Sequence, residues 1–325
     1  MNKKHFLYIL AFIAFIFGCS KVREGFLSDT IRYKDRVLYA KKGMTLTQSD
    51  RINADGSTPP LTFKMSNLRD IATGAPAPQE FFTQYEVMVF KTGEVFNPDT
   101  DTTVELLNKK RELQKMTPMH FNEISGQLSF NRASSNLPVG EYTFDIQATN
   151  VWGTKQYESF ADVHVVEPTT EDVFELIYTA SSASNSSEVF TTLKAPIVTA
   201  KRVSGDGARV ILKYVDKNGR SFNPAQGQVI KRGDRPFFET YAKFNPVQYT
   251  DTAMICDFEV APFPLQKYVT PATDWGYLIY YRIPMAFVAP DGLANHNVNP
   301  VVSFRLKMEG TYVVTVQIPD VTRIN

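Results

Sequence analysis

Alternating apolar and polar residues between closely spaced turns constrain the fold of this chain more than any other feature. Residues 141–150 (EYTFDIQATN) alternate, Trp152 and Gly153 turn the chain, and residues 160–166 return it. Period two places successive side chains on opposite faces of a strand, as in a sheet with one buried face. Similar runs continue toward the C-terminus, including residues 237–244. We therefore predict an all-β chain of two consecutive antiparallel β-sandwich domains.

The boundary between the two domains is expected at Pro168–Asp172, a polar and turn-rich stretch that is typical of an exposed linker. This boundary places the first domain at residues 36–168 and the second at residues 173–325. Both are predicted to be sandwiches, and a jelly-roll arrangement is one alternative for the second.

A short segment of the first domain departs from the β pattern. Asp101 is placed to cap a helix of about residues 101–115, with Leu113 on its apolar side. Glu105 and Lys109 stand four residues apart, which is the spacing of a paired Glu and Lys on one helix face. We predict a helical insertion within a β domain here.

The first nineteen residues describe an export signal. Lys3 and Lys4 form a basic head, Phe6 to Phe17 carries no charge, and Cys19 follows Gly18. This apolar run is shorter than the roughly twenty residues that a membrane-spanning helix needs. A basic head, a short apolar run and small residues are typical of a secretory signal. We predict a signal peptide at 1–18 and a tether at 19–35.

The end of this segment, residues 16–19 (IFGC), resembles the bacterial lipoprotein signal. The resemblance implies that Cys19 is lipidated and holds the chain to a membrane; an ordinary cleaved signal with an incidental cysteine is the alternative. Surface-exposed lipoproteins of Bacteroidota often carry an acidic cluster after this cysteine, and residues 20–24 (SKVRE) lack one. The predicted location is therefore the outer membrane, at either the cell surface or the periplasmic face.

The balance of charges and the cysteine content argue against nucleic-acid binding and against a disulfide within the chain. The chain has 35 Lys and Arg against 34 Asp and Glu, a balance that gives no support for nucleic-acid binding. Cys256 is the only cysteine besides Cys19, so no disulfide within the lipidated chain is expected. Cys256 lies in an apolar strand-like run, which favours a buried small side chain over a reactive thiol.

No catalytic or cofactor motif is present, so the chain is predicted not to be an enzyme and to hold no cofactor. The sequence has no HExxH, GxSxG or glycine-rich phosphate loop, and His164 alternates with valines inside a predicted strand. No metal site is predicted either. Asp55, Asp99 and Asp101 are calcium candidates by their spacing, but turns are rich in Asp for backbone reasons.

Aromatic residues, 13% of the chain, are the best indication of a ligand. Sugar rings stack on aromatic side chains, and residues 275–282 (WGYLIYYR) concentrate such side chains. Period two places Trp275, Tyr277 and Tyr281 on one face and Tyr280 and Arg282 on the other, and one face must pack in a core. A turn tip and a Gly/Asn loop supply the other candidates. The candidate ligand-binding residues are Trp152, Trp275, Tyr277, Tyr280, Tyr281, Arg282, Asn295 and Asn297.

Two resemblances concern the folded part of the chain. Residues 124–128, 140–142 and 148–153 (ISGQL, GEY and ATNVWG) resemble the last strands of cadherin-like and other Ig-like modules, which implies an Ig-like first domain. The layout of lipid signal, tether and successive sandwiches resembles Bacteroidota outer-membrane lipoproteins found beside TonB-dependent importers and starch-utilisation-type binding proteins. Many of these lipoproteins have no known function.

The layout implies a non-enzymatic cell-envelope protein that binds a ligand, most readily a glycan, for nutrient capture and uptake. Its partners would be the membrane, through the lipid on Cys19, and a TonB-dependent importer or other envelope proteins. The alternative is a structural, adhesive or assembly module with protein–protein contacts, either pilus-like or an importer accessory. This is an analogy at the level of the fold, and function has to be argued from a site.

Overall fold

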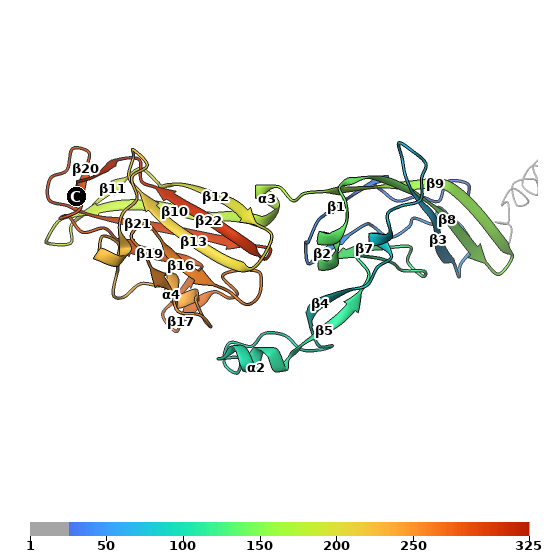
Figure 1. Ribbon diagram of the computed structural model, residues 1–325, viewed down its shortest axis with the longest axis horizontal. Coiled ribbons are helices and arrows are strands. Elements are labelled where there is room, and N and C mark those ends of the chain that lie inside the picture. The colour runs from blue at the N-terminus through green and yellow to red at the C-terminus, as the bar shows by residue number, and fades with distance from the viewer. Residues whose placement is uncertain (1–25, 325) are drawn as a thin grey trace, which may run out of the picture. The chain divides into compact units, whose positions relative to one another are not determined.

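A computed structural model describes residues 26–324, and the predicted signal peptide and Cys19 lie outside the described residues (Figure 1). The chain divides into two compact units. Unit 1 comprises the residues up to Val87 together with Lys115–Glu167, and unit 2 comprises Met88–Gln114 together with the residues from Pro168 onward. Both units are built mainly of strands in antiparallel sheets, which confirms the prediction of an all-β fold.

Unit 1 contains a four-stranded and a three-stranded sheet. The larger sheet has the order β1 (Val37–Lys41), β9 (Gly153–Val166), β8 (Gly140–Asn150) and β3 (Thr62–Asp70). The smaller has the order β2 (Leu46–Gln48), β7 (Leu128–Asn131) and β6 (Met119–Phe121). Only the β1–β9 pair among them is parallel. The alternating run 141–150 forms most of β8, as its period predicts.

The core of unit 1 takes the apolar side chains of β7, β8 and β9. Phe144, Ile146 and Val163 are fully buried, and the ring of Tyr142 packs edge-on against Phe81 at 4.8 Å between centroids. The alternation in β8 explains which side chains face this core, because residues two apart share a face. On the other face, Asp145 is also buried and is satisfied by polar partners of β3 and β9.

Unit 2 contains two five-stranded sheets. One has the order β11 (Phe190–Leu193), β10 (Phe174–Ser184), β21 (Asn297–Leu306), β19 (Leu278–Arg282) and β14 (Ile230–Lys231). The other has the order β12 (Ile197–Ser204), β22 (Gly310–Gln317), β13 (Ala208–Val215), β16 (Met254–Asp257) and β15 (Gln248–Tyr249). Their pairs are antiparallel except for the parallel β13–β22 pair.

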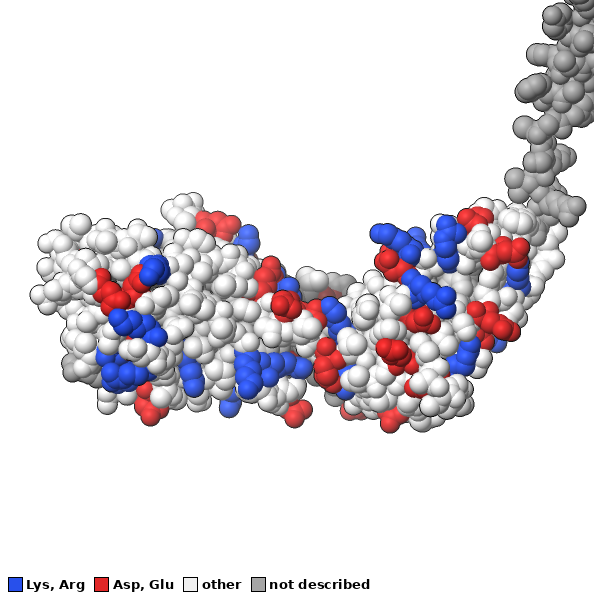
Figure 2. All heavy atoms as spheres, turned by 90° about the horizontal axis from the view of Figure 1, so that it is seen from above, with Lys and Arg blue, Asp and Glu red and all other residues white. Residues whose placement is uncertain are grey.

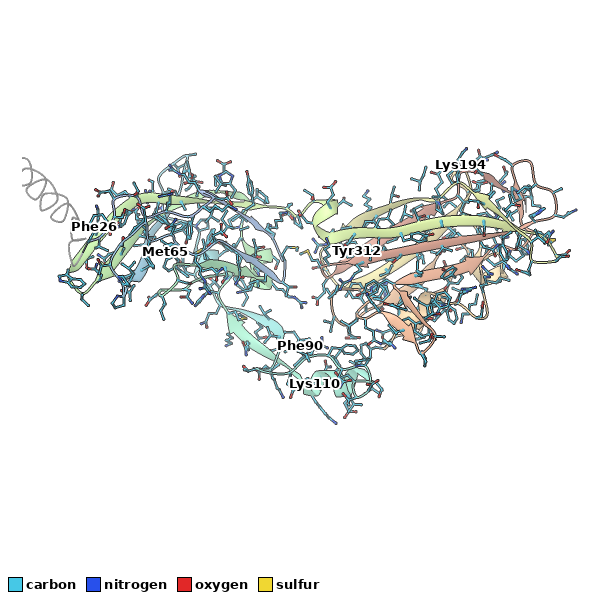
Figure 3. The ribbon with its side chains drawn as sticks, turned by 180° about the vertical axis from the view of Figure 1, so that it is seen from behind. Phe26, Met65, Phe90, Lys110, Lys194 and Tyr312 are labelled. Carbon is cyan, nitrogen blue, oxygen red and sulfur yellow. The ribbon has the colours of Figure 1, made fainter. Side chains whose placement is uncertain are left out.

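The core of unit 2 is rich in large aromatic side chains. Tyr214, Phe304 and Tyr312 are fully buried, and Tyr312 on β22 is labelled in Figure 3. Cys256 on β16 is buried as well, and this burial raises the pKa of its thiol to about 12. The prediction that Cys256 is a packing residue is confirmed.

Short two-stranded ribbons complete the two units. One ribbon pairs β4 (Tyr85–Phe90) with β5 (Arg111–Met116), another pairs β17 (Tyr268–Thr270) with β18 (Thr273–Gly276), and a third pairs β20 (Val288–Pro290) with β23 (Val321–Arg323). The β4–β5 ribbon leads to helix α2 (Val104–Lys109), and Phe90 and Lys110 in this segment are labelled in Figure 3.

The predicted helix at 101–115 is shorter than expected. Helix α2 ends at Lys109, and Leu113 lies in β5 with its side chain exposed. The cap is Thr103, whose hydroxyl accepts a hydrogen bond from the backbone N–H of Leu106 at 3.2 Å. The ion pair predicted between Glu105 and Lys109 is present at 3.2 Å. The residues of β5 pair with β4, and this pairing gives their backbone groups the hydrogen-bond partners that a longer helix would have given them.

Two other predicted segments form helices. Residues 237–244 were expected as a strand, but Phe238–Tyr241 form the single turn α4. Phe238 and Tyr241 are both buried, and three-residue spacing puts them on one side of a helical turn. The predicted linker contains α3 (Thr170–Val173), because the Asp172 carboxylate accepts a hydrogen bond from the Thr169 backbone N–H at 2.8 Å.

The surface of the described residues carries a mixture of charges. On the face of unit 1 that Figure 2 shows, acidic and basic side chains are interspersed, without a broad region of one sign. The face of unit 2 in the same view has larger uncharged areas between its charged groups (Figure 2). Within residues 26–324, no helix has both the length and the apolar content that crossing a bilayer requires.

Candidate functional site

The aromatic segment 275–282 spans two strands of unit 2. Trp275 belongs to β18, and Tyr280 to β19. Gly276, the last residue of β18, has φ +58°, a left-handed conformation that glycine adopts without steric cost. The predicted alternation across all eight residues is therefore wrong, because this conformation interrupts the period of two. Trp275 instead packs edge-on against Tyr280, with ring centroids 5.9 Å apart.

Tyr281 belongs to the core and is removed from the candidate ligand residues. Its side chain is fully buried, like that of Ile279 two residues before it. The Tyr281 hydroxyl donates to the Glu239 carboxylate at 2.8 Å and accepts from the Phe238 backbone N–H at 3.2 Å. Burial raises the pKa of Tyr281 well above its usual value. A fully buried and hydrogen-bonded tyrosine of this kind is a packing residue.

An open groove of about 440 Å³ lies where β18 and β19 meet β10 and β21. We call it the aromatic groove. It brings together three of the predicted residues, Trp275, Tyr277 and Tyr280, each of which is partly exposed. The other lining residues are Ile177, Tyr178, Lys267, Asp274, Gly276, Leu278 and Ser303.

Strand pairing in the first sheet brings one wall of the aromatic groove together. Ser303 on β21 is the register partner of Tyr178 on β10 and of Leu278 on β19. A β-bulge between Leu176 and Tyr178 shifts the register at this point. Bulges re-aim side chains, and Ile177 and Tyr178 are about half exposed, at 47% and 51%. The result is an exposed aromatic ring at the edge of the groove.

Two arginines stack on the rings of the aromatic groove. The guanidinium of Arg235 lies 4.8 Å from the ring centroid of Trp275 and 5.7 Å from that of Tyr280. Arg305 lies 5.0 Å from the ring centroid of Tyr277. Neither arginine is among the residues that line the groove. Cation–π contacts of this kind hold an aromatic ring in one orientation.

Polar groups at one end of the groove come from the β17–β18 ribbon. The Asp274 carboxylate accepts a hydrogen bond from the Gly276 backbone N–H at 2.8 Å and lies 3.7 Å from the Lys267 ammonium. The hydroxyl of Tyr241 donates to the carbonyl oxygens of Gly276 and Leu278, at 3.1 and 2.9 Å. These bonds fix the backbone that carries the rings, while Lys267 and Asp274 keep about half of their side chains exposed.

The remaining sequence candidates lie outside the aromatic groove. Arg282 pairs bidentately with Glu188, with both nitrogen–oxygen distances 2.8 Å, and its Nε donates to Asn299 at 2.8 Å. The side-chain oxygen of Asn297 accepts from the Met285 backbone N–H at 3.0 Å. Asn295 is exposed in a loop with φ +53°. These three residues are therefore structural or separate from the groove.

Trp152 stands at the turn between β8 and β9 in unit 1 and is 52% exposed. It belongs to a different unit from Trp275.

Two of the three calcium candidates, Asp55 and Asp101, have protein partners for their carboxylates. Asp55 accepts from the Ser28 hydroxyl at 2.7 Å and from Thr30, and it lies 3.5 Å from Arg32. These two hydroxyl hydrogen bonds are the main causes that lower the pKa of Asp55. Asp101 is buried and pairs with Lys110 at 2.9 Å.

The third candidate, Asp99, lies in an exposed turn, where its backbone N–H donates to the Asn97 side chain at 2.9 Å. The Asn97 side chain thus has the turn-stabilising role that Asp and Asn commonly have. Over residues 26–324, no group of three or more His, Cys, Asp or Glu side chains is arranged to hold a metal ion.

Sequence reasoning missed half of the groove. Tyr178 and Ser303 are distant from 275–282 in the sequence and are brought near by sheet pairing, whereas Lys267 lies eight positions before Trp275, directly before the β17–β18 ribbon. Asp274 directly precedes Trp275, so its position was a local signal that the sequence offered. Arg235 and Arg305 carry no recognisable motif, because a stacked arginine depends on tertiary contact.

Comparisons with known proteins add little to this site. No protein-family model matches the chain, and no curated protein does. A solved structure of a SusE-like surface-located polysaccharide-binding protein from the Bacteroides thetaiotaomicron heparin utilisation locus is similar at 10% identity, with a TM-score of 0.22. The alignment covers 89% of this chain and 53% of that structure. A likeness at this level carries no argument about fold or ligand.

Proposed function

We propose that this chain is a non-enzymatic glycan-binding lipoprotein of the outer membrane. In this proposal a lipid on Cys19 tethers the chain, and the aromatic groove of unit 2 holds the glycan. The bound glycan would then pass to a TonB-dependent importer or another envelope partner. The observation that carries the proposal is the cluster of four partly exposed rings, Tyr178, Trp275, Tyr277 and Tyr280, around one open groove.

The size and chemistry of the groove support a sugar ligand. Its volume of about 440 Å³ falls within the range of known ligand sites, roughly 300–1,000 Å³. Tyr and Trp side chains combine a flat apolar face with a polar tip, which suits sugar rings that have apolar C–H faces and hydroxyl edges. Lys267 and Asp274 form only a loose pair at 3.7 Å and retain hydrogen-bonding capacity for hydroxyl groups.

The lining of the groove favours binding over hydrolysis. Glycoside hydrolysis usually requires two carboxyl groups that flank the bond to be cleaved. Asp274 is the single carboxylate among the described residues that line the aromatic groove. One carboxylate paired with a lysine can orient a ligand by hydrogen bonds, but it does not form the acid and base pair.

The test is a binding assay of the mature chain against a panel of soluble polysaccharides, using isothermal titration calorimetry or affinity electrophoresis. Trp275→Ala removes one stacking face and is expected to weaken binding of the recognised glycan by about 2 kcal/mol, roughly 30-fold in Kd. The matched control is Trp152→Ala, which changes the other exposed tryptophan in the other unit and should leave the affinity unchanged. Absence of binding to any glycan, or equal loss in both variants, would contradict the proposal.

A further inference from the structure

A small apolar patch lies at the end of unit 1 where the described chain begins. The β8–β9 turn presents Val151 at 68% and Trp152 at 52% exposure, and Phe26 is 43% exposed. We call these three residues the tip patch. Exposed large apolar side chains that gather in one place commonly mark an interaction surface.

Asn150 joins the two segments of the tip patch. Its side-chain amide donates to the carbonyl oxygens of Phe26 and Thr58, each at 3.3 Å, and its side-chain oxygen accepts from the Trp152 backbone N–H at 3.0 Å. The Thr58 backbone N–H also donates to the Phe26 carbonyl at 2.9 Å. Figure 3 shows Phe26 at the same end of unit 1 as this turn. The first described residue is therefore fixed beside the exposed tryptophan.

The position of Cys19 limits how far this patch can lie from a membrane. Phe26 lies seven positions after Cys19, with six residues between them. Even a fully extended chain of that length spans at most about 25 Å. A lipid on Cys19 would therefore keep the end of unit 1 that carries the tip patch near the bilayer surface.

We infer that the tip patch contacts the headgroup region of the membrane to which Cys19 is attached. This inference rests on the proposed lipid at Cys19 and is independent of the glycan proposed for unit 2. Tryptophan is enriched at membrane interfaces, where its ring meets apolar chains and its N–H meets water. A short tether gives the tip patch a high effective concentration at the membrane surface. A weak affinity of its three side chains for the interface is then enough to keep the patch in contact with it.

The chain has only two tryptophans, so the fluorescence of each can be measured separately in a variant that lacks the other. Trp275→Phe leaves Trp152 as the single reporter, and Trp152→Phe leaves Trp275 as the reference in unit 2. The lipidated full-length protein is reconstituted in vesicles of phosphatidylethanolamine and phosphatidylglycerol, with and without brominated acyl chains. Trp152 is expected to show a blue shift in emission and a loss of emission with brominated lipids, and Trp275 a smaller loss.

Two variants separate the contact from other causes. Val151→Asp places a charge in the tip patch and should reduce the quenching of Trp152 while the lipid and the melting temperature are retained. Cys19→Ala should abolish the quenching, because the tether is lost. Mass spectrometry of the wild type decides whether the lipid is present, and an unlipidated mature protein would overturn the inference.

Other outcomes would assign the tip patch to a different partner and overturn the membrane contact. Trp152 emission that responds to protein concentration but not to brominated lipid would indicate a second copy of the chain. A response to soluble glycan alone would indicate a sugar surface. Equal quenching of both tryptophans would mean that the bilayer contacts the protein without preference for the tip patch. Failure of glycan binding at Trp275 would leave the membrane contact unaffected.

Discussion

At the scale of single residues, stacked arginines set the geometry of the aromatic groove. Arg235 contacts both Trp275 and Tyr280, whereas Arg305 contacts Tyr277. The Nε atom of Arg305 is buried and makes no hydrogen bond within residues 26–324, while its guanidinium lies 5.0 Å from the ring centroid of Tyr277. An arginine that stacks on a ring behind a groove positions that ring and does not need to touch the ligand.

Removing Arg235 should therefore weaken glycan binding without removing a contacting residue. Arg235→Ala is expected to lose about 1 kcal/mol, roughly fivefold in Kd, because Trp275 and Tyr280 are no longer held together. Arg232→Ala is the matched control, since Arg232 stacks on Phe190, which does not line the groove. Calorimetry gives the affinities, and time-resolved Trp275 anisotropy should show greater ring motion only for Arg235→Ala. Unchanged binding would show that Arg235 has no positioning role.

The charge of Asp145, a buried carboxylate, contributes to the stability of unit 1. Burial by itself raises the pKa of Asp145, but hydrogen bonds from Asn67, the Ser159 backbone N–H and Arg69 together lower it below the usual value. Asp145→Ala leaves Arg69 without its carboxylate, with a side chain only 19% exposed, and should lower the free energy of unfolding by about 2–3 kcal/mol. Glu105→Ala, in an exposed ion pair, should cost less than about 0.5 kcal/mol.

The lowered pKa of Asp145 determines in which direction the stability of unit 1 changes with pH. The stabilisation by Asp145 is fully present above the pKa of an unfolded aspartate, about 3.9, and is lost as the pH falls through the lower folded value. Urea unfolding of the wild type and of Asp145→Ala should therefore converge in midpoint as the pH is lowered from 6 to 3. A constant difference between the two proteins would exclude this role of the carboxylate.

At the scale of elements, local capping and sheet pairing compete in the segment of α2. The sequence favoured Asp101 as the cap, whereas Thr103 is the capping residue of the structure. Asp101 is instead buried, where it accepts from the Asn97 backbone N–H at 2.7 Å and pairs with Lys110. Asp101 thus closes the loop before the helix and ties it to the residue after the helix.

Substitutions at these two positions distinguish the two roles. Thr103→Ala should lower the free energy of unfolding by about 1 kcal/mol, the usual cost of a lost cap. Asp101→Ala should cost more, because it leaves the Lys110 ammonium and a backbone N–H without their partner. Thr102→Ala, which changes an exposed neighbour, serves as the control in chemical denaturation. The assignment fails if Thr103→Ala is the more damaging of the two.

At the scale of the whole molecule, the chain forms two units whose strands are not contiguous in sequence. Residues Met88–Gln114 interrupt unit 1 and belong to unit 2, within which the Arg111 guanidinium donates to the Glu259 carbonyl oxygen at 3.0 Å. Phe96 likewise packs edge-on against Phe244, with ring centroids 6.3 Å apart. Each unit nevertheless has its own core, so we expect their unfolding to be separable.

Cys256 provides a test of that independence. Its thiol is buried in unit 2 with a pKa raised to about 12, so alkylation by iodoacetamide at pH 8 should be slow in the folded protein. Phe144→Ala removes a fully buried ring from unit 1 and should destabilise that unit by about 3–5 kcal/mol without faster labelling of Cys256. Val314→Ala, in the core of unit 2, should accelerate labelling. Acceleration by both would mean that the units unfold together.

The sequence by itself determined the all-β class, most strands and the burial of Cys256. Alternation and turn residues act over a few positions, so β8 and the β8–β9 turn follow from residues 141–153 alone. The helix at 101–115 was predicted too long because the pairing of β4 with β5 is not visible in local propensity. Local signals also identified Trp275, Tyr277 and Tyr280 as unusual without showing what surrounds them.

Only the tertiary structure decided which aromatic residues face solvent. Tyr281 is buried because β19 turns it toward Tyr214 across the sandwich, with ring centroids 5.7 Å apart, while the left-handed Gly276 directs Trp275 to Tyr280. The groove also needs Tyr178 and Ser303. These two residues are more than a hundred positions apart in the sequence, and the pairing of β10 with β21 brings them together. Register between distant strands depends on the packing of the whole sandwich, and no short window of sequence contains that information.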